Sequence, residues 1–198
     1  MVTLTPRKIS EMKEVAYRPD EIALDGEDQA YIVIRNPGNN LTIFPHYRLG
    51  SEYPKTYGHF HVPPYAENYQ VVFGRAGFLL QKMEGEKVIG AQLKTLEVGE
   101  KFTVPAGWGH VALNLGEGYL ITQDDHDPAH FDNDYSLVKK MRGFAYYICD
   151  SKMTSPSSSP ASRRATERER GQHLVEDGGN WKAVPNPSYT EVPTLEVV

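Results

Sequence analysis

The sequence has very little cysteine and no long apolar run. Cys149 is the only cysteine among 198 residues, so the chain can form no internal disulfide, and a reducing cytoplasm is the expected compartment. No stretch of about 18 apolar residues occurs that could span a membrane, and the N-terminal residues lack the apolar core of a signal peptide. These absences argue against an exported or a membrane-spanning protein.

Positive charge is also scarce. The chain has 21 lysine and arginine residues against 26 aspartate and glutamate residues, which gives a formal net charge of -5. Proteins that bind nucleic acid normally carry a concentrated basic face. We therefore expect neither nucleic acid nor a membrane among the partners of this protein.

From residue 30 onward the sequence contains many short runs rich in β-branched and aromatic residues. Turn-forming residues separate the runs, with Gly85 and Gly99 among them. Short strands at this spacing indicate an antiparallel sandwich or barrel rather than alternating strands and helices, so the predicted fold class is all-β. The runs are 30–36, 40–49, 67–83, 88–98, 101–107, 109–116 and 117–125.

The length fits one β-domain with appendages. Residues 1–29 are polar and mixed in charge, and we expect an N-terminal extension with a short helix that packs on the barrel. Residues 30–150 are expected to form the barrel itself. Residues 151–170 are rich in serine, proline and charge, which predicts a flexible insertion, and residues 171–198 are expected to add a final hairpin and a loose tail.

Three histidines and one glutamate form the most informative pattern. His59 and His61 flank Phe60, and residues two apart on a strand face the same side, so both rings can bind one ion. Glu67 follows shortly, and a tight glycine-rich bend aims His110 inward. Divalent first-row metals favour imidazole and carboxylate ligands, and such a set leaves one or two positions open for substrate or water. The sequence therefore predicts a metal site on a β-scaffold.

Five segments form a wider pattern: 56–61 (TYGHFH), 67–69 (ENY), 77–81 (GFLLQ), 104–114 (VPAGWGHVALN) and 133–135 (NDY). In this pattern the chain resembles the cupins and, more narrowly, the cupin-type phosphoglucose isomerases. The resemblance implies a single cupin barrel, which is a double-stranded β-helix or jelly roll. It also implies an enzyme of glycolysis and gluconeogenesis that interconverts glucose 6-phosphate and fructose 6-phosphate.

The resemblance further implies a role for individual side chains. It implies one divalent transition metal, with iron expected first and manganese, zinc and nickel as alternatives. It also implies that the protein binds a sugar phosphate and forms a homodimer. The implied metal ligands are His59, His61, Glu67 and His110; the implied catalytic residues are Glu67, Tyr69 and Tyr135; and the implied substrate-binding residues are Thr56, Gly58 and Tyr47.

Several alternatives stay open. Glu67 is a candidate both for proton transfer and for the fourth ligand, and a ligated carboxylate is a weaker base, so enediol proton transfer and a metal-assisted hydride shift both remain. The interval from His61 to Glu67 is shorter than the family pattern, so either Pro63 and Pro64 tighten the loop or Glu67 is displaced from the metal. A cupin dioxygenase that uses Fe(II) and a sugar-binding cupin without catalysis are the competing functions.

Other charged residues near these motifs receive ordinary interpretations. His126 and His130 lie in DDHDPAHFDND, which we interpret as a polar loop rather than a second metal-binding segment. Lys55, Arg48 and Arg75 are close in sequence to the implied phosphate-binding residues. We interpret them as solvated surface residues.

Overall fold

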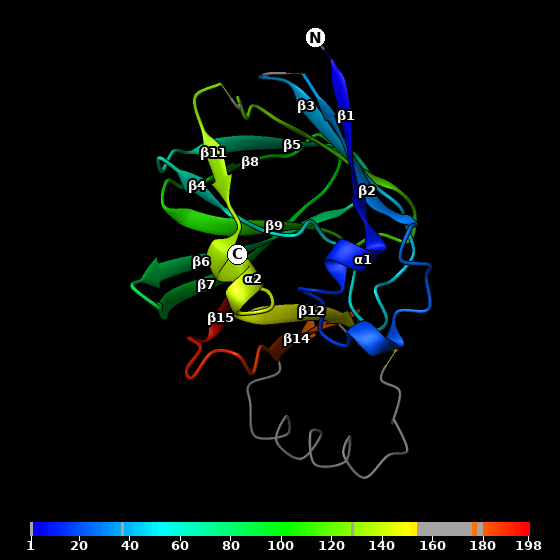
Figure 1. The fold of residues 1–198 in the computed structure, drawn as a ribbon, viewed down its shortest axis with the longest axis vertical. Coiled ribbons are helices and arrows are strands. Elements are labelled where there is room, and N and C mark those ends of the chain that lie inside the picture. The colour runs from blue at the N-terminus through cyan, green and yellow to red at the C-terminus, as the bar shows by residue number, and fades with distance from the viewer. Residues whose placement is uncertain (1, 37, 128, 154–175, 178–179) are drawn as a thin grey trace.

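The all-β prediction is confirmed by the structure, a computed structural model that describes residues 2–36, 38–127, 129–153, 176–177 and 180–198 (Figure 1). Each predicted run forms one or two strands. Most of the serine- and proline-rich insertion, from residue 154 to residue 170, lies outside the described residues. In the part of the chain that the structure describes, no helix is both long enough and apolar enough to cross a membrane.

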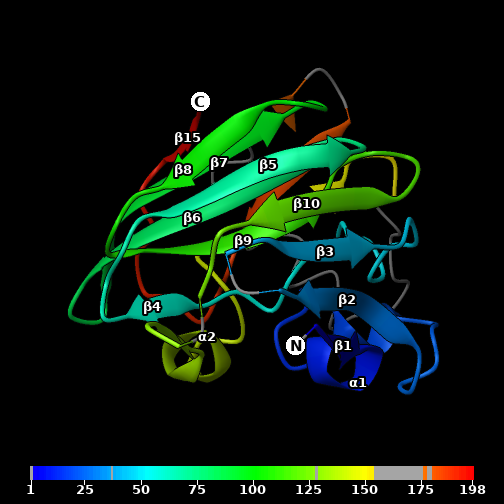
Figure 2. The ribbon, with the colours of Figure 1, turned by 90° about the horizontal axis from the view of Figure 1, so that it is seen from above.

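Six antiparallel strands form the larger sheet, in the order β1-β2-β3-β10-β5-β8, which can be followed from one side to the other in Figure 2. β1, β2 and β3 follow one another in the sequence, whereas the pairs β3-β10, β10-β5 and β5-β8 join strands that are distant in sequence, as in a jelly roll. The strands are β1 (Thr3–Lys8), β2 (Gln29–Arg35), β3 (Asn40–Phe44), β10 (Leu120–Asp124), β5 (Glu67–Phe73) and β8 (Lys101–Val104).

A four-stranded sheet, in the order β15-β7-β6-β9, provides the opposite wall. Its strands are β15 (Leu195–Val197), β7 (Lys87–Leu96), β6 (Ala76–Glu84) and β9 (Trp108–Asn114). Two smaller sheets pair β12 (Tyr146–Asp150) and β13 (Glu176–Asp177) with β14 (Trp181–Pro185), and β11 (Asp132–Asp134) with β4 (Phe60–Val62). The helices are short: α1 (Ile9–Met12), a 3₁₀ turn (Pro19–Glu21) and α2 (Ser136–Lys140).

Four strands lie where the sequence gave no strand signal, and one of them is β11, which falls in the segment predicted as a polar loop. Residues 3–8 join the larger sheet by pairing with β2, although their side chains are nearly all exposed and carry no apolar alternation. Residues 195–197, expected in a tail, pair in parallel with β7. β12 is buried on both faces, so its apolar run does not alternate as a half-exposed strand would.

The core lies between the two main sheets because alternate side chains of their strands point inward. Phe44, Val71 and Leu120 of the larger sheet belong to the same buried cluster as Phe78 and Ala112 of the smaller one. β5 and β9 are therefore placed on facing walls. At one end of this space their inward side chains become polar, and the candidate site lies there.

Candidate metal centre

Two strand segments approach closely to bring His59 beside His110. The backbone N–H of His59 donates to the carbonyl oxygen of His110 at 3.3 Å, and the backbone N–H of His110 donates to the carbonyl oxygen of His59 at 3.1 Å. Glycines permit this approach. Gly58 has a φ of +86° and a Cβ there would lie 2.6 Å from Val111 Cγ2, while a Cβ on Gly109 would lie 2.5 Å from the ring of Phe60. The two glycines thus fix the position of both histidines.

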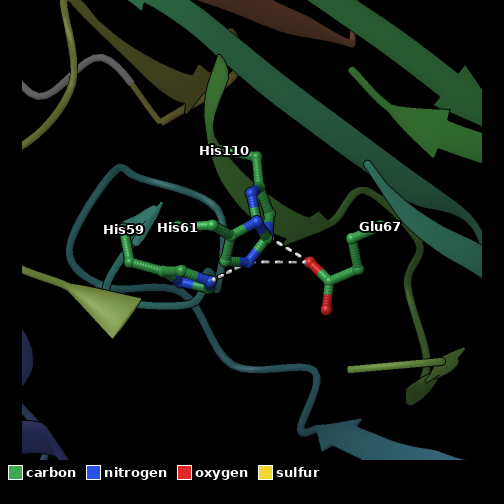
Figure 3. Close-up of side chains that lie close together, drawn as sticks. All are labelled: His59, His61, Glu67 and His110. Carbon is green, nitrogen blue, oxygen red and sulfur yellow. Dashed lines mark hydrogen bonds and ion pairs between the residues drawn. The ribbon is translucent and has the colours of Figure 1, made fainter. Parts of the chain in front are cut away.

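The three imidazole rings and the Glu67 carboxylate converge on one point (Figure 3). The Nε2 atoms of His59 and His61 are 3.0 Å apart, and Glu67 Oε2 lies 3.3 Å from His61 Nε2 and 3.1 Å from His110 Nε2. One ligand atom from each of the four residues lies within 4.8 Å of the others. The structure therefore brings together all four residues that the sequence predicted as metal ligands.

The short loop after His61 does not displace Glu67. Residues 63–66, with two prolines, turn the chain tightly between β4 and β5 and leave Glu67 as the first residue of β5. All contacts of the carboxylate with the histidines use Oε2, and Oε1 points away from the three rings (Figure 3). Of the two alternatives for this loop, the structure has the tightened one.

The charges at the cluster suit a cation. Burial alone would raise the pKa of Glu67, but hydrogen bonds from His110 and His61 hold it well below its ordinary value, so the carboxylate is ionised. Burial, and then the neighbouring His110, lower the pKa of His59 well below its ordinary range, so this imidazole keeps its lone pair. Metal ligands must be deprotonated in this way, and three imidazole nitrogens with one carboxylate oxygen fit a divalent first-row metal.

Most of the residues predicted to contact substrate lie beside the cluster. The Tyr69 hydroxyl donates to Glu67 Oε2 at 2.9 Å and lies 3.0 Å from His110 Nε2. The ring of Tyr135 is 5.7 Å from that of His59. Thr56, Gly58 and Tyr135 line the cavity over the cluster, and the Thr56 hydroxyl accepts a hydrogen bond from the backbone N–H of Ala112.

Tyr47 is not part of this cavity. It lines a separate hollow of about 680 Å³ on the outer side of the larger sheet, and its hydroxyl donates to the carbonyl oxygen of Gln29. The reason is the alternation of side chains along the chain, because Ile43, Pro45 and Tyr47 all line that outer hollow. The structure therefore does not bring Tyr47 to the other predicted site residues.

His126 lies in a loop, as the sequence predicted, but its side chain is buried beside the site. Only 4 % of its surface is exposed, its ring lies 5.7 Å from that of His61, and the Tyr65 hydroxyl is 2.5 Å from its Nδ1. The alternation of buried residues in β10, at positions 120, 122 and 124, continues to position 126 and could have indicated this. His130 remains an exposed residue of the loop.

The basic residues considered for phosphate binding do not reach the cavity. Lys55 is buried rather than solvated, because its Nζ lies 2.5 Å from Glu52 Oε1 and donates to the carbonyl oxygen of Val15 at 2.8 Å. Arg48 pairs with Asp150 at 3.3 Å. Arg75 pairs with Glu97 at 3.0 Å. Phosphate binding by these three residues is therefore not supported by their positions.

A second carboxylate lies in the same cavity. Asp124 Oδ1 accepts hydrogen bonds from Asn40 Nδ2 at 2.7 Å and from the backbone N–H of His126 at 3.2 Å. Burial, followed by the negative charge of Glu67, raises the pKa of Asp124 to about 6. The cavity thus has two carboxylates with different environments, of which only Glu67 touches the clustered rings of His61 and His110.

Three histidines and a glutamate inside a two-sheeted β-fold define a cupin with a site that could hold a metal. The chain belongs to the glucose-6-phosphate isomerase family, since the sequence pattern of "Glucose-6-phosphate isomerase (GPI)" matches residues 7–162.

Known relatives agree with this membership. Glucose-6-phosphate isomerase from Thermococcus kodakarensis is 34% identical over 145 residues, which cover 73% of this chain and 60% of the relative. The one from Pyrococcus furiosus is 29% identical over 136 residues, covering 68% and 59%. The chain thus spans about three fifths of the length of these curated relatives. Among solved structures, the Drosophila melanogaster CENP-C cupin domain is distantly similar, with 16% identity, a TM-score of 0.36 and coverage of 51% of this chain and 69% of that one.

Proposed function

We propose that this protein is a metal-dependent aldose-ketose isomerase that interconverts glucose 6-phosphate and fructose 6-phosphate. Glycolysis and gluconeogenesis in the cytoplasm are its proposed setting. One observation carries the proposal within this family: the carboxylate of Glu67 turns one oxygen to His61 and His110 and keeps the other free of the histidines (Figure 3). A single side chain can then help to hold a metal and still accept a proton.

The metal would be held by His59, His61, Glu67 and His110. When bound, a divalent ion supplies Lewis-acid stabilisation of negative charge on the carbonyl and hydroxyl oxygens of an open-chain sugar. Iron is our first expectation, and manganese, zinc and nickel are alternatives, because imidazole and carboxylate donors suit all four ions.

The reaction moves a hydrogen between C1 and C2, and Glu67 is the group placed to carry it as a proton. Its Oε2 is fixed by the histidines and by the hydroxyl of Tyr69, so Oε1 is held in a defined position. Oε1 would take the proton from one carbon and return it to the next, with no net change in protonation of the enzyme. In a hydride shift Glu67 would serve only as a ligand, and this route remains the alternative.

The test is conversion of fructose 6-phosphate by protein loaded with iron or manganese, run in D₂O. Interconversion with deuterium incorporated at carbon supports proton transfer, and interconversion without label supports the hydride shift. Failure to interconvert these or related sugar phosphates would contradict the proposal. Oxygen uptake with candidate substrates would then indicate a dioxygenase, and binding without turnover would indicate a sugar-binding cupin.

We also propose that the protein is a homodimer joined through the outer face of the larger sheet. Ile32, Ile43, Ile121 and Phe73 lie opposite one another in successive strands and form an apolar row across this face. Phe73 is 55% exposed in the single chain, and burial of this apolar surface against a second copy would stabilise a dimer. Light scattering on the wild type and on Phe73→Glu tests this assembly, and a wild type of monomer mass contradicts it.

A further inference from the structure

The cavity over the histidine cluster contains one group with a permanent positive charge. Arg35 is the single lysine or arginine among its described lining residues, which also include the carboxylates of Glu67 and Asp124. Tyr31, Val33 and Arg35 alternate along β2 and line this cavity, while Ile32 lines the hollow on the opposite face. The guanidinium therefore sits on the inner side of the larger sheet.

Arg35 has no fixed partner of its own within the described residues, where no hydrogen bond or ion pair joins it to another side chain. Nearby basic groups differ. Arg7 pairs with Glu11 at 2.6 Å, and Lys55 pairs with Glu52. Asp124, the carboxylate that could compete for Arg35, already accepts hydrogen bonds from Asn40 and from the backbone of His126. The positive charge of Arg35 is thus available to a ligand.

We propose that Arg35 binds the phosphate group of the substrate at the β2 side of this cavity. The proposal rests on the proposed function and adds a residue that selects phosphorylated sugars. A phosphate dianion entering a cavity that already holds two carboxylates needs a compensating cation. Arginine provides one with a planar set of N–H donors that matches two phosphate oxygens at once.

The test compares Arg35→Gln and Arg35→Lys with wild type as the metal-loaded full chain. Arg18→Gln is the matched control, because Arg18 pairs with Glu21 and does not line the cavity. Calorimetry with inorganic phosphate should give a Kd roughly 10 to 100 times higher for Arg35→Gln, a smaller rise for Arg35→Lys and no change for Arg18→Gln. The KM for fructose 6-phosphate should rise by a similar factor, with kcat and metal content nearly unchanged.

The outcomes separate this inference from the proposed function. Equal phosphate affinity in wild type and Arg35→Gln, or no phosphate binding by wild type, overturns the role of Arg35 even if the enzyme isomerises sugar phosphates. Phosphate binding that depends on Arg35 in a protein without isomerase activity supports the inference and contradicts the proposed function. If Arg35→Gln does not fold, as judged by circular dichroism, Arg35→Lys decides between the same outcomes.

Discussion

Two buried clusters in this molecule each contain a glutamate surrounded by nitrogen atoms, and they are built differently. Glu52 and Lys55 satisfy each other at 2.5 Å, and their remaining atoms bond to the backbone N–H of Tyr17 and the carbonyl oxygen of Val15. At Glu67 the nitrogen atoms belong to histidines whose Nε2 atoms crowd together, and Nδ1 of His61 and of His110 is buried without a described partner.

The two glutamates also differ in acidity. Burial raises the pKa of Glu52 in spite of Lys55. For Glu67 the same burial is outweighed by hydrogen bonds from His110 and His61, and its pKa lies well below the ordinary value. One cluster is closed and neutral as a whole, whereas the other keeps a carboxylate ready for a cation. Burial alone therefore does not mark a functional site, whereas buried polar atoms without a hydrogen-bond partner do.

Removal of one histidine from the cluster at Glu67 should cause the largest loss of metal binding and of isomerase activity. His110→Gln keeps a polar side chain of similar size but removes one imidazole ligand. The metal's stabilisation of the transition state would be lost. We therefore expect the activation free energy to rise by about 5 kcal/mol, which lowers the rate of isomerisation roughly a thousand- to ten-thousandfold. Metal content by mass spectrometry should fall in parallel. Full activity in a variant without metal would contradict the site.

The closed cluster should respond to the equivalent change by losing stability instead. Lys55→Met leaves the Glu52 carboxylate buried without its partner, which should lower the free energy of unfolding by about 4 kcal/mol in urea denaturation. The double variant Glu52→Gln, Lys55→Met is the control and should recover most of this loss because both charges are gone. Metal content should stay as in wild type, and loss of metal without loss of stability would contradict the comparison.

The sequence predicts the histidine cluster but not the cluster of Glu52 and Lys55. The strands follow from local alternation and turn residues, and the pair His59 and His61 follows from a spacing of two on a strand. The burial of Lys55 could not be predicted, because it depends on a carbonyl oxygen 40 residues away in the chain. Arg35 and His126 were missed for a similar reason, since only pairing between distant strands turns them toward the same cavity.

The cavity around the open cluster should give the metal-free protein a pH-dependent stability. Asp124, with a pKa of about 6 in the folded protein against an ordinary 3.8, binds more protons folded than unfolded between these values. The free energy of unfolding should therefore decrease by about 3 kcal/mol as the pH rises from about 4 to about 6. Urea denaturation with a chelator present measures this slope. Asp124→Asn should remove it, and an unchanged slope in that variant would assign the effect to another group.

Loss of the Tyr69 hydroxyl should affect only the histidine cluster, and its effect should be the smallest of those expected. It donates to Glu67 Oε2 and contacts His110 Nε2, so Tyr69→Phe removes a hydrogen bond that orients two ligands and leaves the ring packed on Phe78. Groups that orient metal ligands typically contribute 10- to 100-fold in metal affinity or activity. We therefore expect Tyr69→Phe to weaken the free energy of metal binding by about 2 kcal/mol.

The measurement is a metal-competition Kd together with the pH dependence of kcat, which a purely structural role of Tyr69 would not shift. Tyr57→Phe is the matched control, because the Tyr57 hydroxyl donates to Glu14 at 2.8 Å, away from the histidines. Equal metal affinity and equal pH profiles in both variants would mean that Glu67 is held by the histidines alone. A loss confined to Tyr69→Phe would instead show that the open cluster is oriented through its carboxylate.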